Sequence, residues 1–93
     1  MIESSPNQLP LLRKQSGLSQ KQLAVLIGQD RTLISMYERG RVVPTLASAI
    51  TLQLLFGVNV AEIFPKLRCE LERDLGTRRL QFGRRIIREG KAQ

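Results

Sequence analysis

The apolar positions along the chain recur at helical spacing, and glycines divide them into short segments. Leucines, isoleucines and valines return every three or four residues instead of alternating, a pattern that predicts helices and no strands. A glycine follows each of the first four segments, as is common after a helix C-terminus. We therefore expect an all-α fold with five short helices, over residues 8–16, 20–27, 31–39, 46–56 and 60–64.

Side chains that cap helix N-termini stand just before these segments: Asn7, Ser19, Asp30, Thr45 and Asn59. Ser19 with Gln22, and Asn59 with Glu62, have the spacing of a capping box. Pro10 falls in the first turn of its helix, where a missing N–H costs nothing. The inward positions are then Leu9, Leu12, Leu23, Ala24, Ile27, Leu33, Ile34 and Tyr37.

Residues 66–93 form a second unit after residues 1–65. Leu67, Leu71 and Leu75 repeat every four residues among charged side chains, which predicts an amphipathic helical extension. Gly76 interrupts this pattern and Thr77 can cap a new helix, so we expect one kinked helix or two successive helices.

The charge is large and unevenly distributed. The chain has a net charge of +7, and a small basic domain favours a polyanionic partner, most often nucleic acid. A merely basic protein is the alternative. Residues 1–65 carry six basic and four acidic side chains, a net of +2, whereas residues 66–93 carry nine and four, a net of +5. We expect the two units to have different functions.

Several function classes are disfavoured by composition. The chain has no histidine and one cysteine, so neither a Cys/His zinc site, a histidine acid/base nor an internal disulfide is expected. The sequence offers no metal-ligand cluster or phosphate-cradling glycine loop, and we expect no enzyme and no cofactor. No run approaches the ~20 apolar residues of a membrane span, and no secretory signal is evident. A reducing cytoplasm is the expected compartment.

The segments on either side of Gly28 have the features of a helix-turn-helix. Ala24 is small where the two helices would cross, Gly28 turns the chain, and Ile34 would fill the space between them. From Leu9 to Phe64 the chain resembles the phage lambda-type repressor/Cro (XRE-like) helix-turn-helix family. The resemblance rests on Gly-Leu-Ser-Gln at 17–20, Leu-Ala at 23–24, Gly28, Ile-Ser at 34–35, Glu-Arg-Gly at 38–40, Pro44 and Gly57-Val58.

The resemblance implies a five-helix domain that binds double-stranded operator DNA as a homodimer, with the third helix in the major groove. Its outward positions are the candidate base-reading residues, Arg31, Thr32, Ser35 and Met36. Arg31 suits guanine O6 and N7, although it could contact phosphate alone. Met36 replaces a residue that is commonly polar in the family, and it could touch a thymine methyl group or face solvent.

The candidate phosphate contacts are Gln20, Lys21, Arg39 and Arg41. For Gln20 the alternative is an ordinary first-turn glutamine, and for Lys21 and Arg41 it is a solvated charge. The resemblance pairs Arg13 with Glu38 as a buried structural ion pair, so these two are not counted as DNA contacts. Two exposed surface charges are the alternative.

The side of the fourth helix away from the core carries a semi-apolar stripe, Ala47, Thr51, Leu54 and Val58, where the family that the chain resembles usually has polar residues. We expect it to be covered by the stripe of Leu67, Leu71 and Leu75, either within one chain or across a dimer. The arginines of the last third could contact flanking phosphates or an acidic protein: Arg78, Arg79, Arg84, Arg85 and Arg88.

The leading interpretation is a sequence-specific transcriptional regulator of bacterial or phage origin that occupies operator DNA as a homodimer. One alternative is an antitoxin-type repressor whose C-terminal extension binds a toxin. Another is a helix-turn-helix protein-interaction module, such as an antiactivator, that does not bind DNA.

Overall fold

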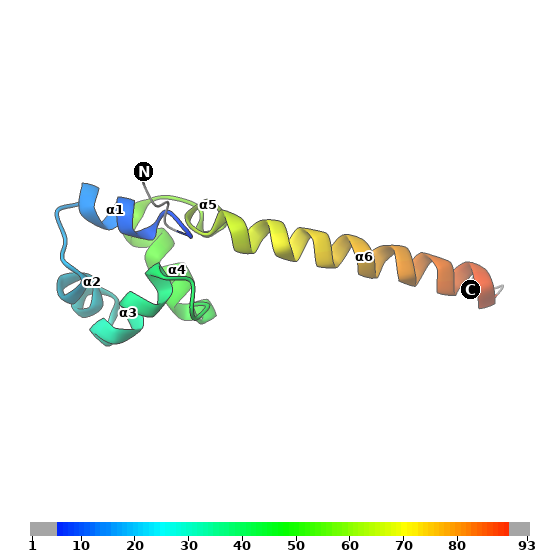
Figure 1. Cartoon of the computed structure of the whole chain (residues 1–93), viewed down its shortest axis with the longest axis horizontal. Helices are drawn as coiled ribbons and strands as arrows, with labels where there is room; N and C mark the ends of the chain where they lie inside the picture. The colour runs from blue at the N-terminus through cyan, green and yellow to red at the C-terminus, as the bar shows by residue number, and fades with distance from the viewer. Residues whose placement is uncertain (1–5, 90–93) are drawn as a thin grey trace.

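A computed structural model describes residues 6–89, and this part of the chain is helical with no strand (Figure 1). The fold is all-α, as the sequence predicts. Its helices are α1 (Leu9–Gln15), α2 (Gln20–Ile27), α3 (Arg31–Glu38), α4 (Leu46–Phe56), α5 (Val60–Ile63) and α6 (Pro65–Glu89). The outer ends of the two predicted units, 1–65 and 66–93, lie outside the described residues, as do the side chains of Arg85 and Arg88.

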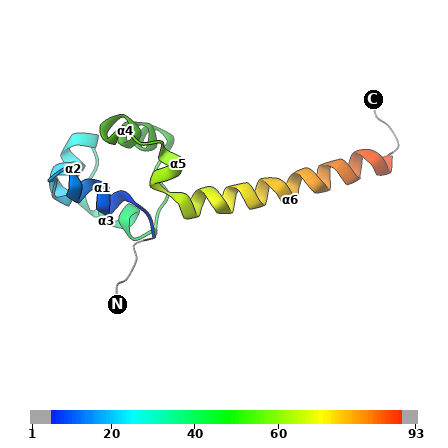
Figure 2. The same ribbon diagram turned by 90° about the horizontal axis from the view of Figure 1, so that it is seen from above.

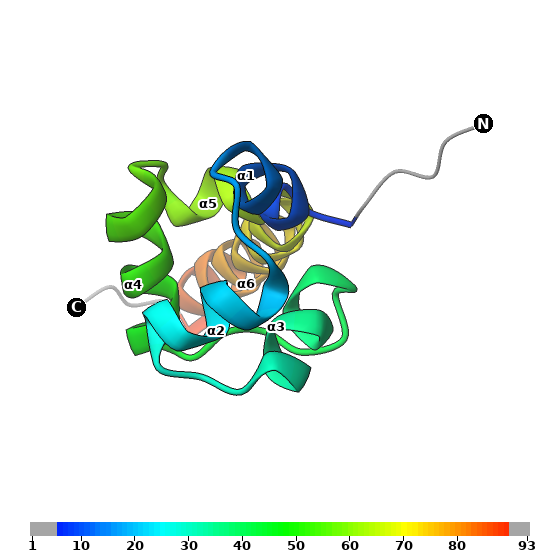
Figure 3. The ribbon, with the colours of Figure 1, turned by 90° about the vertical axis from the view of Figure 1, so that its left-hand side faces the viewer.

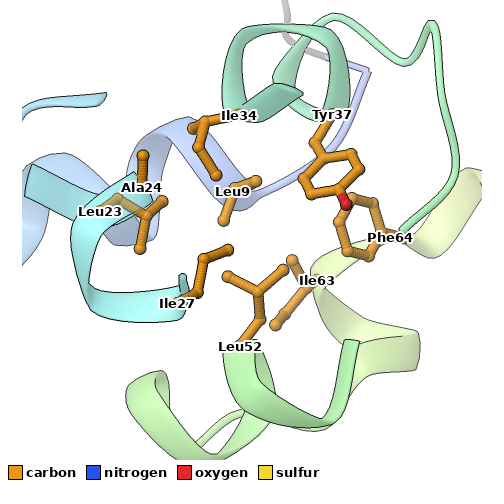
Figure 4. Packing of buried hydrophobic residues seen from close by; sticks show 9 residues of the cluster. All are labelled: Leu9, Leu23, Ala24, Ile27, Ile34, Tyr37, Leu52, Ile63 and Phe64. Atoms are coloured by element: carbon orange, nitrogen blue, oxygen red, sulfur yellow. The ribbon is translucent and has the colours of Figure 1, made fainter. Parts of the chain in front are cut away.

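Helices α1 to α5 enclose one hydrophobic core (Figure 4). Every helix of the domain contributes to it, and its members are Leu9, Leu23, Ala24, Ile27, Ile34, Tyr37, Leu52, Ile63 and Phe64. Leu12, Leu33 and Leu67 pack against this cluster from its edge. Figure 3, which looks along α6, shows α2 and α3 side by side at one edge of this domain.

The caps set the helix starts as the sequence predicts. Ser19 Oγ accepts from the Gln22 N–H at 3.0 Å, and Gln22 Oε1 accepts from the Ser19 N–H at 2.9 Å, which completes the capping box. Asp30 caps α3 through the Thr32 N–H at 3.1 Å. Thr45 and Asn59 likewise accept from N–H groups in the first turns of α4 and α5. Asn59 Oδ1 accepts from the Ala61 N–H at 2.9 Å and not from Glu62, so the capping box predicted for Asn59 and Glu62 is wrong. These bonds satisfy amides that have no partner within their own helix.

Asn7 does more than start α1. Its Oδ1 accepts from the Leu9 N–H at 3.0 Å, and its Nδ2 donates to the Tyr37 backbone oxygen at 2.9 Å. The buried Asn7 side chain therefore joins the start of α1 to the last turn of α3.

The last helix is continuous, which corrects the predicted interruption at Gly76. α6 runs without a break from Pro65 to Glu89 and projects from the domain (Figures 1 and 2). Thr77 does not cap a new helix, because its Oγ1 donates to the Arg73 backbone oxygen at 3.2 Å within the same helix. A glycine inside a helix costs about 1 kcal/mol, whereas ending the helix there would leave several N–H and C=O groups without partners.

The expected covering of the outer face of α4 by the extension within one chain is wrong. α6 packs on α5 near its start, through Leu67, and then leaves the domain. Leu54 is 77% exposed, Leu71 is 55% exposed and Leu75 is 45% exposed. The covering of these residues across a dimer stays a prediction. Among the described residues, none of the helices combines the length and apolar character that crossing a bilayer requires.

Candidate nucleic-acid interface

The pair α2 and α3 presents one helix on the surface while fixing its orientation. Leu23, Ala24 and Ile27 of α2 pack with Ile34 of α3 in the core. Gly28, at φ +70°, makes the left-handed turn between the helices, a conformation that favours glycine. The core therefore contacts only one side of α3, and the other side stays accessible.

A link that the sequence does not reveal holds the turn against α4. Gln29 Nε2 donates to the buried Ser48 Oγ at 2.9 Å. The two residues lie 19 positions apart, so no local spacing announces their pairing. Gln29 and Ser48 are positioning residues that sequence reasoning missed.

The outward side of α3 carries all four candidate base-reading residues. At 100° per residue, Arg31, Thr32, Ser35 and Met36 span an arc of about 140°. Arg31 and Thr32 are exposed, and Ser35 and Met36 are partly exposed. The opposite side of the helix is buried and includes Ile34 and Tyr37, and Glu38 in the last turn is also buried. The four residues therefore share one accessible surface, although their contact with bases stays a prediction.

Arg13 and Glu38 form an ion pair inside the domain, between α1 and the end of α3. Arg13 Nε donates to Glu38 Oε2, and Arg13 Nη2 donates to Glu38 Oε1 at 3.3 Å. The third donor, Arg13 Nη1, bonds the Leu18 backbone oxygen at 2.9 Å. Both residues are more than nine-tenths buried. This pair fixes the end of α3 and leaves neither side chain free for DNA.

Gln20 connects this ion pair to the exposed side of α3. Its Nε2 donates to Glu38 Oε1 at 3.0 Å, and its Oε1 accepts a long 3.4 Å bond from Arg31 Nη1. Both ends of the Gln20 amide are thus engaged within the protein. The side chain therefore links Glu38 to Arg31 at the start of α3, a role that its position in the sequence does not disclose.

The other candidate phosphate contacts lie near the two ends of this surface. Lys21 is exposed in the first turn of α2, while Arg39 and Arg41 are exposed just after α3. In the described part of the chain, the backbone N–H groups of Gln20 and Lys21 have no acceptor. Free amides at a helix N-terminus suit a phosphate oxygen.

Comparisons with known proteins agree with this arrangement. A helix-turn-helix family model matches residues 11–63. A protein of Thermococcus kodakarensis, named as an HTH-type transcriptional regulatory protein, is 37% identical over 67 residues. That match covers 72% of this chain and 21% of the relative, so the chain spans about a fifth of the relative's length.

Two solved structures are similar in fold and sequence. The restriction-modification controller protein C.AhdI from Aeromonas hydrophila has a TM-score of 0.55 and 35% identity, over 61% of this chain and 86% of that one. The hypothetical transcription factor NHTF from Neisseria has a TM-score of 0.56 and 31% identity, over 70% of this chain and 75% of that one. The chain belongs to the helix-turn-helix family of transcriptional regulators, of the lambda repressor and Cro type.

Proposed function

We propose that this protein is a sequence-specific regulator of transcription that binds operator DNA as a homodimer, with α3 in the major groove. The observation that carries the proposal is the division of α3 into a buried side and an accessible side that begins with Arg31. A helix held in this way can enter a groove without disturbing the core.

The accessible side of α3 supplies the base contacts. Arg31 donates two hydrogen bonds to guanine O6 and N7, a pairing worth about 1–3 kcal/mol of discrimination. Thr32 offers a methyl group and a hydroxyl group, Ser35 bonds a base or a phosphate, and Met36 contacts a thymine methyl group.

The phosphate contacts flank these residues. The free N–H groups at the start of α2 and the ammonium group of Lys21 bind one phosphate, while Arg39 and Arg41 bind others. The affinity that they supply does not depend on base sequence and falls as salt rises. The similarity to C.AhdI, which is named a restriction-modification controller protein, supports regulation as the outcome of binding.

Selection from a library of random duplexes tests the proposal, followed by fluorescence anisotropy on the enriched duplex. Arg31→Ala should weaken binding about 10- to 100-fold and relax the preference at one base pair. Arg73→Ala is the matched control, because it removes an exposed arginine from α6. We expect it to change affinity by less than about threefold.

Two results would contradict the proposal. Equal losses for Arg31→Ala and Arg73→Ala would mean that the protein binds DNA by charge alone. The absence of any enriched duplex would favour a protein-interaction module over a DNA-binding regulator.

A further inference from the structure

Gln20 lies where the buried ion pair of the domain meets the exposed side of α3. Arg31 and Glu38 are seven residues apart, so they lie on nearly the same side of α3, two turns and about 10 Å from each other. The side chain of Gln20, from the first turn of α2, bridges the two. Its Nε2 donates to Glu38 Oε1 at 3.0 Å, and its Oε1 accepts from Arg31 Nη1 at 3.4 Å. One amide thus joins a buried carboxylate to a candidate base-reading side chain.

Glu38 determines which end of the Gln20 amide faces Arg31. The Glu38 carboxylate accepts from Arg13 Nε and Nη2, and a carboxylate paired in this way can only accept hydrogen bonds. The NH₂ end of Gln20 must therefore face Glu38, which leaves the carbonyl end for Arg31. A flipped amide would set oxygen against carboxylate and NH₂ against guanidinium, and both bonds would be lost. The fold consequently presents an acceptor beside the first turn of α3.

An acceptor at this point restricts Arg31 without using up the donors that a base needs. A guanidinium group has five N–H donors in one plane, and Gln20 takes one of those on Nη1. The donors on Nε and Nη2 stay available for guanine O6 and N7, which require two parallel bonds. An exposed arginine samples many rotamers that a bound one must give up. The bond to Gln20 reduces their number before DNA arrives, which favours binding.

The role of Gln20 can be told apart from that of a phosphate contact. Both ends of its amide already have protein partners, and the residue is only partly exposed, whereas the next residue, Lys21, is exposed and charged. Removing a phosphate contact weakens binding to all base sequences alike. Removing a group that acts on Arg31 weakens binding only to the sequence that Arg31 prefers. The two roles therefore predict different measurements.

We propose that Gln20 is a positioning residue, which increases the specificity of Arg31 for its base pair and is itself oriented by Glu38. This rests on the proposed function, because it assigns Gln20 a part in base reading by Arg31. Arg13 acts one step further away, since it holds the Glu38 carboxylate. The buried ion pair therefore contributes to base discrimination as well as to the stability of the domain.

Gln20→Met tests the proposal, because methionine keeps the length and helix propensity of glutamine and makes neither bond. Fluorescence anisotropy gives the dissociation constants for the selected duplex and for a duplex in which the base pair read by Arg31 is replaced. The ratio of the two constants is the discrimination. Gln20→Met should lower it about three- to tenfold, through weaker binding of the selected duplex. In an Arg31→Ala background it should change the ratio by less than about twofold, because nothing remains for Gln20 to position.

Lys21→Met is the matched control, with the same replacement one position further along α2. It removes a charge proposed to bind phosphate, so it should weaken both duplexes by a similar factor, reduce the salt dependence and leave the discrimination as it is. If Gln20→Met also weakened both duplexes equally, or left the discrimination unchanged, the proposal would be overturned. The same loss of discrimination with and without Arg31 would overturn it as well.

A second measurement needs no DNA. Nuclear magnetic relaxation of the Arg31 Nε–H group reports the mobility of its guanidinium, with the exposed Arg73 of α6 as the reference. The order parameter should be higher for Arg31 than for Arg73, and Gln20→Met should remove the difference. Equal order parameters in the parent protein would overturn the proposal, even if Gln20→Met bound no duplex.

Failure of this proposal is distinct from failure of the proposed function. If a duplex is enriched and Arg31→Ala removes the discrimination while Gln20→Met preserves it, only the role of Gln20 is refuted. A protein that enriches no duplex refutes both, since one rests on the other.

Discussion

Replacing Glu38 with alanine removes the partner of a guanidinium group that lies inside the domain. Arg13 donates to both carboxylate oxygens of Glu38 and, through its third donor, to the Leu18 backbone oxygen. Without Glu38, the positive charge of Arg13 stays buried and keeps only the Leu18 carbonyl. The lost acceptor also leaves Gln20 Nε2 without its 3.0 Å bond.

Breaking a buried ion pair by removing one partner costs about 3–5 kcal/mol. Glu38→Ala should therefore remove a large part of the stability of a domain of this size, since domains are stable by only about 5–15 kcal/mol. Replacing both partners with apolar side chains leaves no buried charge. The free energy of unfolding of the Arg13→Met, Glu38→Leu double variant should consequently lie within about 2 kcal/mol of the parent value. The remaining loss comes from the hydrogen bonds to Leu18 and Gln20.

Urea denaturation followed by circular dichroism measures these free energies at 10 °C, where the destabilised variants retain the most structure. The parent protein, Arg13→Met, Glu38→Leu and the double variant form a double-mutant cycle, and Glu38→Ala is compared directly with the parent protein. A single-variant loss below about 1 kcal/mol would refute the assignment of a buried charge pair. A double variant whose loss equals the sum of the two single losses would show that the two side chains are not coupled.

Four further substitutions test the packing, the turn and the caps by the same denaturation assay. Leu52→Ala, at a fully buried site, should cost about 2–5 kcal/mol, whereas the exposed Leu54→Ala should stay within about 0.5 kcal/mol; similar losses would contradict the core assignment. Gly28→Ala should cost about 1–2 kcal/mol through its positive φ alone, because its Cβ would meet open space. Ser19→Ala should cost about 1 kcal/mol by removing the acceptor for the Gln22 N–H, and an unchanged midpoint would argue against the capping box.

The helix boundaries of α2, α3 and α4 could be predicted to within about a residue because their signals are local. Ser19, Asp30 and Thr45 each bond an N–H two or three positions further along, so the sequence alone contains both partners. Gly28 and Gly57 end their helices because each adopts a left-handed backbone conformation, with φ of 70° and 68°.

The course of α6 was harder to predict because local and longer-range effects compete there. Gly76 has the propensity of a helix terminator, but the leucines, arginines and glutamates before it and the arginines after it favour the helix by more than Gly76 and Gly83 oppose it. The direction in which α6 leaves the domain depends on how Phe64 and Leu67 pack against the core. No pattern within α6 itself specifies that packing.

In the candidate site, too, local patterns could be predicted from the sequence, whereas contacts between distant residues could not. Helical spacing is enough to place Arg31, Thr32, Ser35 and Met36 on one side of α3. The engagement of Gln20 by Glu38 joins residues 18 positions apart and becomes visible only when the fold brings α2 beside the end of α3. The first-turn position of Gln20 in α2 suggested a phosphate contact and gave no sign of this second role.

The protruding α6 affects how the mass of the protein can be measured. The radius of gyration is 17.8 Å, whereas a rounded chain of this length would have about 12 Å. A single copy should therefore leave a gel-filtration column as early as a globular protein of considerably greater mass. Elution volume alone would report a false multimer, and small-angle scattering should show an asymmetric particle with an extended maximum dimension.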